Sequence, residues 1–130
     1  MQSIAAIPFF EKVLGAKVKD CFFEDGTVVF LVQQGQMGKI RTRQGWDKVQ
    51  DLGRGMGKKI QVLEFHENPE VFVLQLLHPL HPKTEWKDGV LTIHGKDAWE
   101  KGQIFGREKT RYRKIQELIK KYFHAEVRVQ

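Results

Sequence analysis

The strongest constraint on the fold of this 130-residue chain is an internal repeat. Two hairpin-turn signals, Asp25-Gly26 and Asp88-Gly89, recur after about 65 positions, as do two strand-like segments around Val62 and Val127. Because like elements return at nearly one spacing, the chain is predicted to contain two copies of one small unit. The copies are expected to occupy residues 1–66 and 67–130.

Hydrophobic periodicity and turn residues predict similar elements in both copies. In the first copy they are a helix at 3–14, strands at 18–23 and 27–32, a glycine-punctuated basic segment at 35–57 with helical potential at 46–52, and a strand at 59–65. In the second they are a helix at 69–77, strands at 84–87 and 90–94, helices at 97–105 and 110–123, and a strand at 125–129. Pro8 is expected to kink the first helix or to shorten its start. Since almost no linker separates the copies, we expect them to pack rigidly.

The composition favours a basic, globular protein with a polyanionic partner. Lys and Arg number 22 against 16 Asp and Glu, which gives a formal net charge of +6. No apolar run approaches the ~20 residues that span a bilayer, and the first residues lack a signal-peptide pattern, so no membrane partner is expected. The single cysteine, Cys21, fits a reducing compartment, and a cytoplasmic location is predicted.

Each copy places a basic turn between its last two helices. A turn that leads into a helix presents free backbone N–H groups and the positive end of the helix dipole, where a phosphate can bind. The first basic turn is Arg41-Thr42-Arg43-Gln44, which runs into Gly45, and the second is Gly106-Arg107-Glu108-Lys109. Basic side chains beside such turns add charge-assisted contacts to the same phosphate.

The order of elements in each copy resembles the type II KH domain, an RNA-binding module whose GxxG loop holds the backbone of about four nucleotides. The tandem arrangement is similar to archaeal NusA-like transcription termination factors. The segments that carry this likeness are 9–16, 18–21, 28–30, 35–39 and 58–65 in the first copy, and 101–106, 115–123 and 125–129 in the second. The resemblance implies an α+β fold of two tandem type II KH-like domains, each helix-strand-strand-helix-helix-strand.

The same resemblance implies a function in transcription termination or antitermination, with single-stranded RNA as partner and RNA polymerase as a further candidate. A factor in ribosomal RNA processing is the nearest alternative. The alternative from another class is a protein-interaction module, in a transcription or ribosome-assembly complex, whose KH loops have lost specific RNA binding. No enzyme activity, cofactor or small-molecule substrate is expected.

The predicted RNA-binding residues are those of the two basic turns and the positions beside them. They are Lys39, Arg41, Thr42, Arg43, Gln44, Gly45 and Lys48 in the first copy, and Lys101, Gly106, Arg107, Glu108, Lys109, Arg111, Arg113 and Lys114 in the second. Neither turn holds an intact GxxG, because only Gly106 stands at an expected glycine position. Binding is therefore expected to depend more on charge than on a tight backbone cradle.

Two other glycine motifs are interpreted as structural. Gly35-Gln36-Met37-Gly38 matches GxxG literally, but it follows a strand and precedes the first of the paired helices, so it is predicted to be a lead-in turn. The segment 53–57 is interpreted as a flexible helix exit. Phe105 and Tyr112 are expected to face the core, whereas for Trp46 a core position and base stacking remain equally open.

Residues that could support catalysis or metal binding lack the required spacing. His78 and His81 flank prolines, and no set of Cys and His ligands at zinc spacing exists in the sequence. Cys21 lies in an apolar strand, where a thiol behaves as a small hydrophobe. The basic side chains of Lys114, Lys120 and Lys121 form either a solvated helix face or an extension of the RNA-binding surface.

Overall fold

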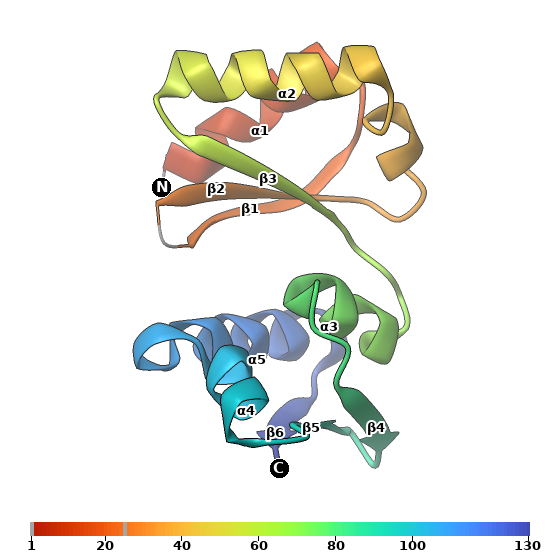
Figure 1. Cartoon of the computed structure of the whole chain (residues 1–130). Coiled ribbons are helices and arrows are strands. Elements are labelled where there is room, and N and C mark those ends of the chain that lie inside the picture. Colours follow the sequence, from red (N-terminus) through yellow and green to blue (C-terminus); the bar gives the residue numbers. More distant parts are fainter. Residues whose placement is uncertain (1, 25) are drawn as a thin grey trace. The chain divides into compact units, whose positions relative to one another are not determined.

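The computed structural model describes the backbone of residues 2–24 and 26–130, and the side chains of residues 6–24 and 26–130. Residue contacts divide the chain into two compact units, Met1–His66 (unit 1) and Glu67–Gln130 (unit 2). Each unit is an α+β structure with one three-stranded sheet (Figure 1). The predicted turn residue Asp25 lies outside the described residues.

Unit 1 is built around a central strand with one antiparallel and one parallel neighbour. Its elements are α1 (Gln2–Leu14), β1 (Val18–Glu24), β2 (Thr27–Val32), the 3-10 helix η1 (Met37–Lys39), α2 (Arg43–Met56) and β3 (Lys59–Glu64). β2 pairs antiparallel with β1 and parallel with β3. Since a parallel neighbour requires a crossover connection, η1 and α2 must pass over the sheet between β2 and β3. Both α1 and α2 cover the same face of the sheet (Figure 1).

Aromatic stacking and buried aliphatic side chains join the helices of unit 1 to its sheet. The ring of Phe10 on α1 stacks on Phe30 of β2, with centroids 4.1 Å apart and an interplanar angle of 18°. Val49 and Leu52 bring α2 into the same core cluster. α1 begins six residues before Pro8, so the proline does not shorten the helix start.

α2 is longer than its sequence pattern predicts. The helix extends from Arg43 to Met56, and Gly57 closes it in the left-handed conformation with φ 66°. The segment 53–57 is therefore helical up to Met56, and its interpretation as a flexible exit is wrong. A glycine is required at position 53 because a Cβ there would lie 2.8 Å from the carbonyl oxygen of Lys58.

Unit 2 repeats the topology of unit 1. Its elements are α3 (Pro69–Leu77), β4 (Lys83–Lys87), β5 (Val90–His94), α4 (Ala98–Phe105), the 3-10 helix η2 (Arg107–Lys109), α5 (Thr110–Phe123) and β6 (Glu126–Val129). β5 is central, antiparallel to β4 and parallel to β6. The predicted start of α3 is confirmed, since the Asn68 side chain accepts hydrogen bonds from the N–H groups of Glu70 and Val71.

The core of unit 2 lies between its helices and β5. Ile104 of α4 and Ile115 and Ile119 of α5 are buried together with Leu91 and Ile93 of the central strand. The half-buried rings of Phe105 and Tyr112 pack edge to face, with centroids 5.1 Å apart. The hydroxyl of Tyr112 also donates to the carbonyl oxygen of Val127 at 2.9 Å. Both aromatic side chains therefore point toward the interior of unit 2, as predicted.

Two features of the described residues bear on other classes of function. None of the described helices combines the length and apolar character needed to cross a membrane. Cys21 is buried in β1, and this burial raises the pKa of its thiol from the ordinary 9.0 to about 11, with the neighbouring Asp20 carboxylate adding to the effect. The thiol is therefore protonated at neutral pH, as expected for a structural cysteine.

We predict that Cys21 resists thiol reagents in the folded protein. Its labelling by a disulfide reagent at pH 8 should be slow in buffer and complete within minutes in urea, because only unfolding exposes the sulfur and restores its ordinary pKa. The folded state holds this proton more tightly, so the associated stability is fully present below pH 9 and is lost as the pH rises through about 11. Labelling of the folded protein at the rate of the unfolded one would contradict the prediction.

Candidate nucleic-acid interface

The second basic turn is an exposed corner between α4 and α5. Gly106 ends α4 with φ 72°, and its N–H donates to the carbonyl oxygen of Gly102 at 2.9 Å. A Cβ at this position would lie 2.6 Å from the Cβ of Arg111, so a side chain would force the helices apart. The N–H groups of Arg107 and Glu108 donate to no acceptor within the described part of the chain. Two consecutive amides are thus available to an anion at this corner.

The backbone of the second basic turn has a conformation that favours glycine, although its last two residues are not glycine. Glu108 and Lys109 both adopt left-handed conformations, with φ values of 54° and 62°. Lys109 stands where the second glycine of the motif would be. A lysine in this region of φ/ψ space costs about 1 kcal/mol or more relative to glycine. The chain therefore retains the turn conformation at a conformational cost, and gains a cation at the corner.

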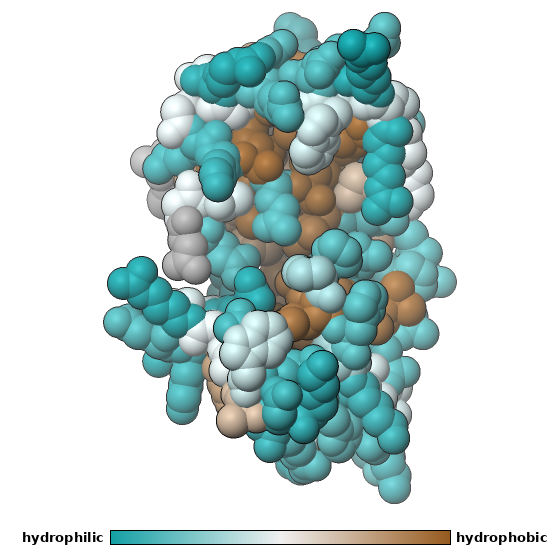
Figure 2. Space-filling view, viewed as in Figure 1, coloured by the Kyte–Doolittle hydropathy of each residue, from teal (hydrophilic) through white to brown (hydrophobic). Residues whose placement is uncertain are grey.

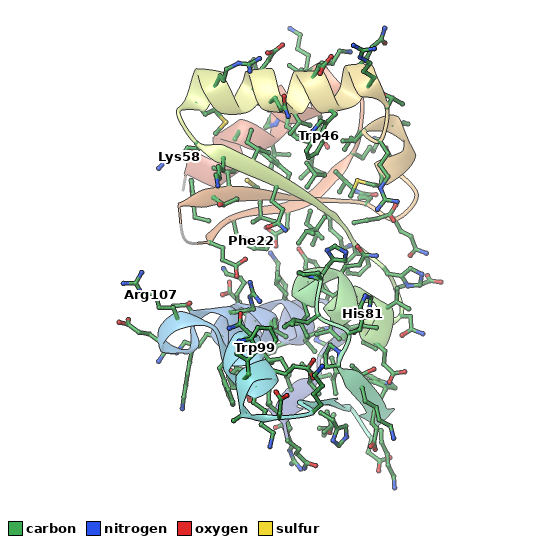
Figure 3. All side chains as sticks on the ribbon, viewed as in Figure 1. Phe22, Trp46, Lys58, His81, Trp99 and Arg107 are labelled. Carbon is green, nitrogen blue, oxygen red and sulfur yellow. The ribbon has the colours of Figure 1, made fainter. Side chains whose placement is uncertain are left out.

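Basic side chains surround the second basic turn. Arg107 projects into solvent at the end of unit 2 in Figure 3, and Lys101, Lys109 and Arg113 are also exposed. Arg111 is half-buried, and its guanidinium donates to the carbonyl oxygen of Gln103 at 3.2 Å, which ties α5 back to α4. Lys114 is half-buried too, and its amine lies 3.3 Å from the Glu117 carboxylate. Arg111 thus helps to hold the turn, whereas Lys114 forms an ion pair within α5.

The first basic turn is shorter than predicted. Arg43 and Gln44 form the first turn of α2, so only Ile40, Arg41 and Thr42 separate η1 from the helix. Thr42 caps α2, since its side-chain oxygen accepts a hydrogen bond from the N–H of Gly45 at 2.9 Å. The N–H groups of Arg43 and Gln44 donate to no acceptor in the described residues, which gives this corner two available amides as well. Lys48 is exposed on α2, together with Arg41 and Arg43.

Two residues assigned to RNA contact in the first copy have structural roles instead. Gly45 is buried, its N–H is used by Thr42, and a Cβ on it would lie 2.5 Å from the carbonyl oxygen of Ile40. Gly45 permits η1 and α2 to approach closely. Because it is buried, it is not available as the RNA contact that the sequence predicted. Lys39 is exposed, but its amine donates to the carbonyl oxygen of Gly15 at 3.3 Å.

The literal GxxG at 35–38 already holds an anion of the protein itself. The carboxylate of Glu64, at the end of β3, accepts hydrogen bonds from the N–H of Gly35 at 2.9 Å and of Met37 at 3.3 Å. A phosphate would have to displace this carboxylate and would meet its negative charge. The segment is therefore a lead-in turn, as predicted, whose second half already belongs to η1, and not an RNA clamp.

Sequence reasoning missed a groove between α2 and β3. It encloses about 720 Å³ and is lined by Trp46, Val49, Gln50, Gly53, Arg54, Gly57, Lys58, Lys59 and Ile60. Trp46 extends from α2 toward β3, and Lys58 lies at the other end of the groove (Figure 3). Apolar surface is visible below α2 in unit 1, bordered by hydrophilic side chains (Figure 2). The only signal of this groove in the sequence is Trp46, an aromatic residue that follows the first basic turn.

The histidines do not form a metal site. His78 and His81 lie edge to face with ring centroids 6.4 Å apart, and His94 Nε2 lies 2.8 Å from the Glu85 carboxylate across the β4–β5 pair. Across residues 6–24 and 26–130, no group of three or more His, Cys, Asp or Glu side chains is placed to hold a metal ion.

Three archaeal proteins are similar to this chain in sequence. No family model matches the chain. The "Probable transcription termination protein NusA" of Methanocaldococcus jannaschii is 28% identical over 97 residues, which cover 75% of this chain and 50% of the relative. The protein of the same name from Methanococcus vannielii is 31% identical over 85 residues, covering 65% and 49%. That from Halococcus morrhuae is 29% identical over 105 residues, covering 78% and 75%.

The chain is similar in sequence to these archaeal NusA proteins. It spans about half the length of the first two of these relatives. A crystal structure of APE1850 shares the fold, with a TM-score of 0.69 at 21% identity over 99% of this chain and 98% of that one. The similarity to the NusA proteins is therefore a similarity of sequence. The solved structure supports the α+β fold alone.

Glycine at position 109, which restores the GxxG, should stabilise the second basic turn. Replacing Lys109 by glycine is expected to raise the free energy of unfolding by about 1 kcal/mol relative to Lys109→Ala, because both variants lose the charge but only glycine relieves the left-handed backbone. Urea denaturation of the two variants measures the difference. Equal stability of Lys109→Gly and Lys109→Ala would show that the turn does not hold this conformation in solution.

Proposed function

We propose that this chain is a NusA-like transcription termination factor that binds single-stranded RNA through two type II KH-like domains, residues 1–66 and 67–130. The observation that carries the proposal is the pair of basic turns. In each unit, two consecutive free amides stand at the start of a helix beside exposed arginines, at Arg43-Gln44 and at Arg107-Glu108. This arrangement suits the phosphates of a polynucleotide.

In unit 2, a phosphate would accept hydrogen bonds from the N–H groups of Arg107 and Glu108. The guanidinium of Arg107 and the amine of Lys109 are both exposed and add charge to the same anion. Gly106 keeps a Cβ away from Arg111 and thereby allows α4 and α5 to meet at the corner. The carboxylate of Glu108 opposes the anion, so the turn is a weaker phosphate site than one with two glycines and no acid.

In unit 1, the α2–β3 groove provides the contact surface for bases. Trp46 is 51% exposed at the start of α2, three residues after Arg43, so a strand held at the first basic turn passes directly over the indole. The groove has an apolar base and a rim of Arg54, Lys58 and Lys59. Stacking on an aromatic ring is tolerant of sequence, and basic rims follow the phosphate backbone. The expected specificity is for single strands rather than for a particular base order.

A protein-binding role has its own supporting observation. A groove of about 410 Å³ between α1 and α2 is lined by apolar side chains that include Phe9, Val13 and Met56. Phe9 is 56% exposed and lines this groove. This groove would suit a contact with another protein of the transcription machinery, and it leaves the basic turns accessible.

The RNA-binding proposal predicts a salt-dependent affinity that falls when Arg107 is removed. For a single-stranded RNA of ten nucleotides, the slope of log K against log salt should decrease in magnitude by about 0.7 to 1 in Arg107→Ala, because one phosphate contact is lost. Fluorescence anisotropy at several salt concentrations measures the slope. Lys87→Ala, which removes an exposed charge from β4 in the same unit, is the matched control and should leave the slope unchanged.

The same assay tests whether RNA is the partner at all. Single-stranded RNA should bind more tightly than duplex RNA of equal length, because the exposed aromatic at the groove requires unpaired bases. A flat salt dependence, or equal affinity for duplex and single strand, would contradict the proposal and favour the protein-binding role.

Trp46 provides a separate prediction for unit 1. Trp46→Ala should weaken binding of the ten-nucleotide RNA by about fivefold or more, because stacking of one base contributes about 1 kcal/mol or more. The salt slope should not change, since no phosphate contact is removed. Intrinsic fluorescence of a protein with Trp46 as its single tryptophan should be quenched on RNA addition, and unquenched fluorescence at saturation would exclude stacking.

A further inference from the structure

A cavity in unit 2 lies at the opposite end of α4 from the second basic turn. It encloses about 530 Å³ between the α3–β4 loop, the end of β5 and the first turn of α4. Trp99 forms the α4 wall and is 63% exposed, more than Trp46 or Trp86. Pro79, His81 and Pro82 form the facing wall on the loop. Figure 3 shows Trp99 on α4 and His81 on that loop.

The base of this cavity is fixed by hydrogen bonds. The buried carboxylate of Glu100 accepts a hydrogen bond from the N–H of Lys96 at 3.0 Å, and the Asp97 side chain accepts one from the N–H of Glu100 at 2.8 Å. The N–H of Gly95 donates to the carbonyl oxygen of Gln130 at 2.9 Å. The turn at 95–97 is thus held to both α4 and the end of β6, so the cavity is preformed.

The exposed charge at the rim of the cavity is positive. Lys83 and Lys96 are both exposed on its edge, on β4 and on the β5–α4 turn. The acids nearby are already engaged: Glu85 contacts His94 Nε2 at 2.8 Å, Glu100 is buried against the Lys96 amide, and Asp97 caps α4. An anionic ligand with a flat apolar part therefore suits this cavity better than a cationic ligand does.

We propose that this cavity is a second contact for single-stranded RNA, in which one unstacked base lies against the Trp99 indole while the adjoining phosphates meet Lys83 and Lys96. The inference rests on the proposed RNA-binding function and extends it to residues outside the basic turns. An aromatic face beside cations is the arrangement by which single-strand binders hold bases without reading their sequence. The two prolines supply a rigid wall opposite the ring.

The length of α4 sets the length of RNA that occupies both contacts. Trp99, in the wall of the cavity, is seven residues before Gly106, which is about 10 Å along the helix axis at ~1.5 Å per residue. An RNA that occupies both contacts must therefore extend beyond the nucleotides held at the basic turn. Because a KH-like turn holds about four nucleotides, an RNA of about ten nucleotides is long enough for both contacts and one of four is not.

The test compares oligoadenylates of four and ten nucleotides on the full chain by fluorescence anisotropy. Trp99→Ala should weaken binding of the ten-nucleotide RNA by about fivefold or more and change binding of the four-nucleotide RNA by less than twofold. Trp86→Ala is the matched control, because Trp86 is an exposed tryptophan of β4 that does not line the cavity, and it should bind both RNAs like the unaltered protein. Circular dichroism confirms that each variant is folded.

A second pair of substitutions separates stacking from charge. Changing Lys83 and Lys96 together to glutamine should lower the magnitude of the salt slope by about 1.4 for the ten-nucleotide RNA, whereas Trp99→Ala should leave the slope unchanged. Stacking in the cavity also predicts quenching of a protein with Trp99 as its single tryptophan by the longer RNA.

Each outcome separates this inference from the proposed function. If the unaltered protein binds the ten-nucleotide RNA and Trp99→Ala binds it equally well, the cavity is not an RNA contact, and the exposed indole is left as a protein contact. An equal loss with both RNA lengths would show a structural effect and would also overturn the inference. If the unaltered protein binds neither RNA, the proposed function itself fails, and the inference fails with it.

Discussion

Parallel pairing of the last strand with the central strand is the constraint on which both units depend. β3 beside β2, and β6 beside β5, can be reached only by a connection that crosses the sheet. In both units this connection is a short helix, a corner and a longer helix that packs on the sheet. The corner has no partner for its first amides in the described structure, because the following helix begins there. The available N–H groups therefore result from the topology, and the basic side chains beside them add electrostatic attraction for an anion.

The two corners achieve similar exposure by different local means. In unit 1, Thr42 caps the helix and buried Gly45 allows close approach to Ile40, so the chain turns without left-handed residues. In unit 2, Glu108 and Lys109 adopt left-handed conformations with no side-chain cap on α5. The corner of unit 2 therefore depends on tertiary contacts, such as the Arg111 bond to the Gln103 carbonyl, to hold a backbone that its residues do not prefer.

Most elements could be predicted because their local signals agree with their tertiary roles. Asn68-Pro69 begins a helix, Asp88-Gly89 forms a hairpin turn, and the apolar stripe of residues 110–123 forms α5. The misses occurred where packing overrides propensity. Positions 45 and 53 of α2 are glycine because neighbouring carbonyl oxygens leave no room for a Cβ, and no pattern along the chain reports that contact. The α2–β3 groove and the cavity at Trp99 were likewise hidden, because their walls come from segments distant in sequence.

The carboxylate of Glu64 in the glycine turn at 35–38 has a consequence for how such chains are recognised. A pattern search would select this turn as the clamp, although the protein fills it with an acid from its own third strand. Replacing Gly35, whose φ is 87°, would strain the turn, and a functional screen would mistake that strain for loss of a ligand. Whether the N–H groups of such a glycine turn are available to a phosphate depends on a side chain distant in sequence. Here that side chain is Glu64, at the end of β3.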